Sequence, residues 1–336
     1  MTAATLLASC GVADPQAWRQ DWGQRLASWR RDGEPEAVAA LDRAHPSLVE
    51  GFWLPLLTAL EHRASGGPVV IGLNGPVGAG KSTLAQVLGG LAAQGGLRLA
   101  VASIDDAYRS WEERRRLLVG NPFGVWRVPP GSHDPGALAT ALATWRTGGL
   151  LRLPRFDKTL RGGEGDRCGW SEQKADAVLL EGWLLGCRPL PETGPATGLA
   201  SLAEAANLDL SAAEWAWLPH WNRELKAYEP LSRALDGLWI LRPVRWTLPL
   251  RWRLQAEAQQ RHRSPDGGLP ATAVKDLVRS SLGSLPPPLY QDPLLDAAAG
   301  VGVLDGRRRC LWSGTGAEAR AALAQLSLSS SLSAIG

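Results

Sequence analysis

Lysine is scarce in this 336-residue chain, and arginine supplies most of the positive charge. The formal net charge is only +3, which is too small to require a nucleic-acid partner, and we expect none. A lysine that does occur inside a glycine-rich or charged loop therefore stands out as a candidate for chemistry. The five lysines are Lys81, Lys158, Lys174, Lys226 and Lys275.

Long apolar runs are also absent. No stretch approaches the ~20 apolar residues that a membrane-spanning helix needs. The N-terminus lacks the basic region followed by an apolar run that marks a secretory signal. Cys10, Cys168, Cys187 and Cys310 form no CxxC pair and no zinc spacing, which favours free thiols in a reducing compartment. We therefore expect a cytoplasmic protein with no membrane partner, and the oligomeric state stays open.

Short apolar runs alternate with helical patterns after residue 65, and before that residue the chain has only helical spacing. Continuous apolar strands between helices are typical of a parallel sheet covered on both faces. The sequence therefore predicts an α/β fold. Residues 186–200 are rich in proline and glycine and are expected to form a surface loop. The predicted strands span residues 68–73, 97–104, 177–183, 237–243 and 300–306.

The segment GPVGAGKS, residues 75–82, fits the pattern G-x-x-x-x-G-K-[ST] and lies between a predicted strand and a predicted helix. Glycines let backbone N–H groups approach phosphate oxygens, and the helix adds its positive dipole end. Lys81 would reach the β- and γ-phosphates, and the Ser82 hydroxyl would bind Mg²⁺. The motif predicts a site for a nucleoside triphosphate with Mg²⁺, made by Gly75, Gly78, Ala79, Gly80, Lys81, Ser82 and Thr83.

Acidic residues follow two predicted strands at the edge where ligands bind in open α/β sheets. Asp105 and Asp106 follow the second strand. One of them would accept the proton of an attacking hydroxyl, and the alternative is that both only cap the next helix. Glu181 ends the third strand, in the manner of an acid that binds Mg²⁺ directly or through water.

Two polar segments between these strands are predicted as loops on the acceptor side. One contains His133 and Asp134, and the other runs from Leu153 to Arg167. Arginine and lysine there suit an anionic acceptor, although each alone is also an ordinary solvated residue, and His133 alone suggests a structural histidine. The second segment supplies the candidates Arg155, Lys158, Asp166 and Arg167.

A basic helix is predicted around residues 251–257. Arg253 on this helix would neutralise charge as part of a lid, or would simply pair with Glu257 one turn later. The helical spacing does not separate these two interpretations.

Taken in the order in which they occur along the chain, these motifs resemble the plant and cyanobacterial D-glycerate 3-kinase family. This family is a group of P-loop kinases of small metabolites and is related to pantothenate and uridine kinases. The resemblance covers about residues 68–305. It departs from the family at Ala107, where an aromatic is usual, and at Glu164, where arginine is frequent. The matching segments are GPVGAGKST, SIDDAY, GSHD, LPRFDK with GEGDR, LLEGWLLG and WRLQAE.

The resemblance implies a P-loop NTPase-type fold and a division into a helical N-terminal extension (1–65), a kinase domain (66–315), and a C-terminal helix with a low-complexity tail (316–336). It implies ATP-dependent phosphorylation of D-glycerate to 3-phospho-D-glycerate in photorespiratory salvage. Lys81, Asp105 and Arg253 would be catalytic. Ser82 and Glu181 would hold Mg²⁺. The residues implied for the acceptor are Asp105, Asp106, His133, Asp134, Arg155, Lys158, Asp166 and Arg167.

Two alternatives remain at this stage. Another P-loop kinase of the pantothenate or uridine type would share the phosphate site but not the need for a cationic acceptor loop. A non-catalytic ATP-binding regulator would need neither a carboxylate beside the P-loop nor that loop. The extension carries no motif, and it would either pack against the edge of the sheet or bind a partner.

Overall fold

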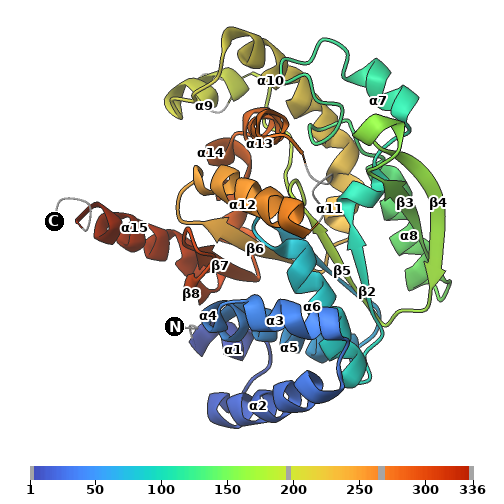
Figure 1. The fold of residues 1–336 in the computed structure, drawn as a ribbon. Helices are drawn as coiled ribbons and strands as arrows, with labels where there is room; N and C mark the ends of the chain where they lie inside the picture. The colour runs from blue at the N-terminus through green and yellow to red at the C-terminus, as the bar shows by residue number, and fades with distance from the viewer. Residues whose placement is uncertain (1–3, 194–197, 264–268, 333–336) are drawn as a thin grey trace.

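A computed structural model describes residues 4–193, 198–263 and 269–332. Its centre is a six-stranded sheet in the order β2-β5-β1-β6-β7-β8 (Figure 1). The first five strands in this order are parallel, and β8 is antiparallel to β7. The fold is thus the predicted α/β architecture. The strands are β1 (Val69–Asn74), β2 (Leu99–Ser103), β5 (Ala177–Gly182), β6 (Gly237–Pro243), β7 (Gly300–Leu304) and β8 (Cys310–Gly314).

Alternate residues of the central strands point to opposite faces, and each face has its own core. Ile71 on β1 belongs to the core shared with the N-terminal helices. Its neighbour Val70 belongs to the core on the other face, shared with α8 (Pro135–Arg146) and α10 (Ala212–Glu224). Because both faces are covered, the strands are apolar throughout, as the sequence predicts.

The N-terminal extension packs into this sheet. Phe52 is fully buried and lies edge-on to Trp239 of β6, with 5.3 Å between the ring centroids. Its ring also packs against Gly302 of β7, where a Cβ atom would lie only 2.7 Å from it. Trp22 and Trp29 share the same core. In Figure 1 these helices form a blue layer beside α6 (Lys81–Gln94). The extension comprises α1 (Ala4–Ser9), α2 (Pro15–Asp32), α3 (Pro35–Arg43), α4 (Pro46–Leu48), a π-helical turn (Val49–Trp53) and α5 (Leu54–Ala64).

The polar segment from Leu153 to Arg167 is not a loop, and this prediction was wrong. Most of it lies in an antiparallel hairpin of β3 (Leu151–Asp157) and β4 (Asp166–Gln173), separate from the main sheet. The hairpin lies at the edge of the molecule in Figure 1. One side of β3 is buried through Leu151 and Leu153, while alternate residues are exposed, so its apolar content is too low to stand out.

The remaining helices complete the layers. Residues 316–332 form α15, and residues 333–336 of the predicted tail lie outside the described residues. The part of the chain described here contains no helix long and apolar enough to cross a membrane. The other helices are α7 (Trp111–Leu117), α9 (Leu199–Ala205), α11 (Glu229–Arg233), α12 (Leu248–Arg263), α13 (Ala271–Ser284) and α14 (Pro287–Tyr290), with 3₁₀ turns at Ile104–Ala107, Arg161–Gly163, Leu225–Tyr228 and Asp292–Ala297.

Candidate active site

The glycine-rich loop follows β1 and leads directly into α6, as the motif predicts. Gly78 and Gly80 both have left-handed backbone conformations, with φ of +78° and +92°. A side-chain carbon added at Gly78 would lie 2.9 Å from Cβ of Trp252 and 3.0 Å from the backbone nitrogen of Arg253. Glycine is therefore required at 78 both by its φ angle and by the close approach of α12.

Lys81 and Ser82 at the start of α6 both face Glu181, at the end of β5. The Ser82 hydroxyl donates a 2.8 Å hydrogen bond to Glu181, and Nζ of Lys81 lies 3.9 Å from the same carboxylate. Nζ of Lys81 also donates to the carbonyl of Pro76 within the loop, at 3.2 Å. Burial lowers the pKa of Lys81, and the charge of Glu181 partly offsets this effect.

The donor set fits a magnesium ion shared with phosphate oxygens. Ser82 and Glu181 supply two adjacent oxygen ligands, and Mg²⁺ is commonly held by one or two protein oxygens together with substrate phosphates and waters. Within residues 4–193, 198–263 and 269–332, no group of three or more histidine, cysteine, aspartate or glutamate side chains is suited to hold a metal ion by itself. The arrangement therefore suits a metal that arrives with a nucleotide.

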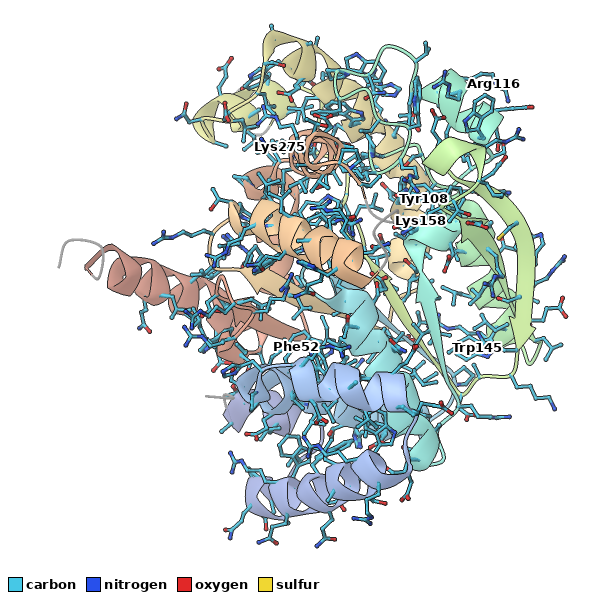
Figure 2. All side chains as sticks on the ribbon, viewed as in Figure 1. Phe52, Tyr108, Arg116, Trp145, Lys158 and Lys275 are labelled. Carbon is cyan, nitrogen blue, oxygen red and sulfur yellow. The ribbon has the colours of Figure 1, made fainter. Side chains whose placement is uncertain are left out.

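Asp105 lies in the 3₁₀ turn after β2 and is surrounded by cationic and hydroxyl groups. Nζ of Lys158 donates to its Oδ2 at 2.8 Å, and Nε2 of His133 lies 3.8 Å from its Oδ1. Burial favours the neutral acid, but Lys158 and His133 outweigh that effect and hold the pKa of Asp105 well below its usual value. Asp105 is thus a carboxylate at neutral pH. Figure 2 labels Lys158 next to Tyr108, close to the carboxyl ends of the strands.

His133 is held on its other side by buried groups. Its Nδ1 lies 3.0 Å from the Tyr228 hydroxyl, and its ring stacks on Tyr108 with 4.2 Å between centroids. Burial lowers the pKa of His133, which favours the neutral imidazole. Its Nε2 has no hydrogen-bond partner among the described residues. The structural role expected of His133 therefore coexists with a position directly beside Asp105.

Arg253 on α12 pairs with Glu257 one turn later, as one of the two alternatives for this helix states. The same arginine lines the cavity in front of the P-loop. Arg308, in the turn after β7, donates to the Gly78 carbonyl at 2.7 Å and to the Trp252 carbonyl at 3.0 Å. Helix α12 is thus fixed against the P-loop with Arg253 at the cavity wall.

One cavity of about 590 Å³ brings most of the predicted residues together. This volume is in the range of small-molecule sites, roughly 300–1,000 Å³. Trp183, which follows Glu181 in the LLEGWLLG segment, and Ser281 on α13 also line the cavity. The predicted residues that line the cavity are Gly78, Ala79, Gly80, Lys81, Ser82, Thr83, Asp105, His133, Lys158, Glu181 and Arg253.

Other predicted residues support this cavity from outside its lining. Arg167 donates through Nε to the Tyr108 carbonyl at 3.0 Å and through Nη2 to Asp134 at 2.9 Å. Asp134 also caps α8. Asp166 accepts from the Trp111 backbone nitrogen and from Arg161.

Three further candidates also lie outside the cavity lining. Gly75 precedes the turn of the P-loop, where an added side-chain carbon would meet Leu241 at 3.0 Å. Asp106 and Arg155 do not line the cavity. Burial and the charge of Asp105 raise the pKa of Asp106.

Arg127 is a cavity residue that the sequence motifs do not identify. Its Nη2 donates to the Gly163 carbonyl at 3.1 Å, whereas its Nη1 is buried without a partner among the described residues. Its neighbour Val128 also lines the cavity, and it has φ of +90°, which is rare for a β-branched residue. Such strain accumulates at functional sites. Proximity in sequence to His133 is the only signal that points to Arg127 beforehand.

The loop that carries Arg127 is fixed by a buried arginine. Arg114 of α7 is fully buried and donates to the carbonyls of Trp126 at 2.9 Å and Glu164 at 3.1 Å, and to that of Gly165. The backbone before Arg127 is therefore joined to the β3–β4 connection, which fixes the segment that carries Arg127 at the cavity wall.

No protein-family model matches the chain, but individual relatives do. It is 31% identical over 224 residues to D-glycerate 3-kinase, chloroplastic, from Arabidopsis thaliana, covering 63% of this chain and 45% of that protein, less than half its length. It is 30% identical to an uncharacterized kinase of Schizosaccharomyces pombe, covering 58% of this chain and 72% of the relative. The solved structure of D-glycerate 3-kinase from Cryptococcus neoformans superposes with a TM-score of 0.67 and 26% identity, covering 79% of this chain and 97% of that one.

Proposed function

Because the chain belongs to the kinase family that includes these relatives, we propose that it transfers the γ-phosphate of ATP to the 3-hydroxyl of D-glycerate, giving 3-phospho-D-glycerate. The observation that carries this proposal is the shared cavity. A carboxylate, Asp105, and an arginine with one unpartnered guanidinium nitrogen, Arg127, line the same space as the phosphate-binding loop. A regulator that only binds ATP needs neither group.

On the donor side, the chain's residues hold phosphate and stabilise negative charge. The left-handed glycines direct backbone N–H groups into the loop, and Lys81 adds a charge at its mouth. Ser82 and Glu181 would hold Mg²⁺, which when bound supplies charge neutralisation to the phosphate oxygens. Arg253 adds a guanidinium from α12.

On the acceptor side, Asp105 accepts the proton of the attacking hydroxyl. Its low pKa keeps it ionised, Lys158 donates a hydrogen bond to its Oδ2, and Nε2 of His133 lies 3.8 Å from its Oδ1. Lys158 and Arg127 bind the carboxylate of the acceptor, because both cations border the cavity and Arg127 has a free donor. Arg167 is not assigned this role, because it does not line the cavity and its Nε and Nη2 already donate to the Tyr108 carbonyl and to Asp134.

The direct test is acceptor-dependent turnover. The purified protein would be supplied with ATP, Mg²⁺ and one acceptor at a time: D-glycerate, L-glycerate, uridine or pantothenate. ADP release would be followed, and the product would be identified by NMR. We expect turnover with D-glycerate and phosphate on its 3-oxygen. Turnover only with uridine or pantothenate would reassign the acceptor, and ATP binding without turnover on any of them would support a regulator.

Lys81→Ala gives the matched negative control in this assay. We expect its kcat to fall by orders of magnitude, since a charge that stabilises the transferred phosphoryl group is removed. Lys275→Ala changes an exposed lysine on α13 that does not line the cavity, and it should keep normal turnover.

We also propose a cytoplasmic location and a role in photorespiratory salvage. Family membership supports the salvage role. The four cysteines support the location, since Cys10, Cys168, Cys187 and Cys310 are all free thiols, as is usual in a reducing compartment. Cell fractionation with an antibody to the protein tests the location directly.

A further inference from the structure

The cavity has further lining residues that belong neither to the P-loop nor to the acceptor side, and they define one compartment of it. One side of this compartment comes from the N-terminal extension, and the other from the turn between β7 and β8. The extension is the part of the chain for which no motif suggests a role. The residues that define this compartment, here called the distal compartment, are Ala40, Arg43, Ala44, His45, Leu48, Trp53, Arg307 and Arg308.

We propose that the distal compartment binds the nucleoside part of ATP, so that the N-terminal extension determines how the kinase recognises its nucleotide. This inference rests on the proposed function, because it places the base and ribose next to the predicted phosphate cradle. It assigns the extension to substrate binding instead of to a partner protein.

The two sides of the distal compartment are held in fixed positions. The backbone nitrogen of Cys310, at the start of β8, donates to the Ser47 hydroxyl of α4 at 3.1 Å. Arg308 in the opposite turn has φ of +60° and donates to the Gly78 carbonyl of the P-loop at 2.7 Å. The extension, the turn and the P-loop therefore form one pre-organised site, which lowers the entropy cost of binding.

His45 presents a defined hydrogen-bond donor at this site. The backbone N–H of Ser47 donates to Nδ1 of His45 at 3.2 Å, and the Ser47 hydroxyl lies 2.9 Å from the same nitrogen. A backbone N–H can only donate, so Nδ1 must accept, and the proton of the neutral ring lies on Nε2. Nε2–H is then available for a ring nitrogen of a base or for a ribose oxygen.

Trp53 contributes a polar group that lacks a partner. Its side chain is only 3% exposed, it borders the distal compartment, and its Nε1 has no hydrogen bond within the described residues. A buried donor of this kind is costly unless a ligand or water satisfies it. Trp53 also ends a π-helical turn, a distortion that occurs frequently at functional sites.

Two arginines line the distal compartment without an ion-pair partner among the described residues. Arg43 and Arg307 make no ion pair in residues 4–193, 198–263 and 269–332, although eighteen pairs exist elsewhere in that part of the chain. Ala40, Ala44 and Leu48 add an apolar surface beside them. Planar guanidinium groups stack on aromatic rings, so an apolar surface with flanking arginines suits a heteroaromatic base.

The test uses calorimetry to measure the affinity of the protein for ATP and, separately, for inorganic tripolyphosphate, each in the presence of Mg²⁺. Tripolyphosphate has the phosphate chain but no nucleoside. We expect the wild-type protein to bind ATP more tightly, and the double variant with His45→Ala and Arg43→Ala to lose ~10-fold in ATP affinity with unchanged tripolyphosphate affinity. Trp53→Phe should weaken ATP by several-fold. Arg31→Ala, an exposed arginine of the same extension outside the cavity, should match the wild type.

The other outcomes separate the two proposals. Wild-type ATP affinity in the double variant would overturn the nucleoside assignment and leave the kinase function standing. An equal loss for both ligands would also overturn it, because the extension would then act through the fold. If the wild-type protein binds neither ligand, the proposed function itself fails.

Discussion

Nζ of Lys158 donates a 2.8 Å hydrogen bond to Oδ2 of Asp105, although the two residues lie 53 positions apart in the chain. The bond joins the end of the β3–β4 hairpin to the 3₁₀ turn after β2. It places a cation against the carboxylate that we propose as the general base. In the proposed complex the acceptor's carboxylate and the base contact the same ammonium group, so the pH dependence of the reaction tests this arrangement.

Replacing Lys158 should move the acidic limb of the pH profile. In the wild type, Lys158 and His133 together hold the pKa of Asp105 below its usual value, so the base stays ionised well into the acid range. In Lys158→Met, burial of the carboxyl is opposed less strongly, its pKa rises, and activity is lost at a higher pH than in the wild type. The measurement is kcat/KM for D-glycerate from about pH 5 to pH 9. Lys174→Met, at an exposed position, is the control, and an acidic limb that does not move in Lys158→Met would contradict the arrangement.

Asp105→Asn should spare nucleotide binding and slow phosphoryl transfer by ~10²-fold or more, since the amide cannot accept the proton. Single-turnover kinetics separate transfer from ATP binding. Asp106→Asn should have a much smaller effect, because Asp106 does not line the cavity. If the large loss appears in Asp106→Asn instead, the base has been assigned to the wrong aspartate.

Arg127→Gln should raise the KM for D-glycerate by roughly 30-fold, which corresponds to about 2 kcal/mol for losing one partner of a buried charged pair. Arg127→Lys should recover only part of this loss, because an ammonium group cannot form two parallel hydrogen bonds. The KM for ATP should change little. Arg152→Gln, on the exposed side of β3, serves as the control. A wild-type KM for glycerate in Arg127→Gln would leave Lys158 as the anion-binding group.

Alanine at two positions of the P-loop should have different consequences. Gly80→Ala introduces a side chain at positive φ into open space, with a cost of roughly 1–2 kcal/mol. Gly78→Ala has the same conformational cost and adds a contact of 2.9 Å with Trp252. We expect Gly78→Ala to weaken ATP binding and lower the melting temperature more than Gly80→Ala, as measured by calorimetry and thermal unfolding. Equal effects would mean that α12 readily moves away.

The parallel sheet was predictable because its strands are covered on both faces. The predicted strand over 237–243 coincides with β6, and the other four strands differ by one or two residues at their ends. The hairpin was missed because β3 is only partly buried, β4 has no buried residue, and Pro154 with the charged residues around it suggests a loop. β8 was missed as well, because five residues with one exposed leucine carry little pattern.

Some residues of the site were likewise predictable from the sequence, and others were not. Lys81, Ser82, Asp105 and Glu181 lie at strand ends or helix starts, and local sequence alone indicates such positions. The significance of Arg127 depends on which of its nitrogens lacks a partner, which only the folded chain determines. Arg114 is a second example, because it lies in the charged segment Glu112–Arg116 and yet is fully buried and donates to several carbonyls.

The contact of Phe52 with Trp239 and Gly302 has a practical consequence for protein engineering. A shortened enzyme that starts at the first strand would leave an aromatic-sized hole against β6 and β7. Loss of a buried phenylalanine side chain alone typically costs 3–5 kcal/mol, which is a large share of the stability of an ordinary domain. We therefore expect trimmed versions to be recovered as insoluble material, whereas fusions to the N-terminus that keep residues 4–64 should fold.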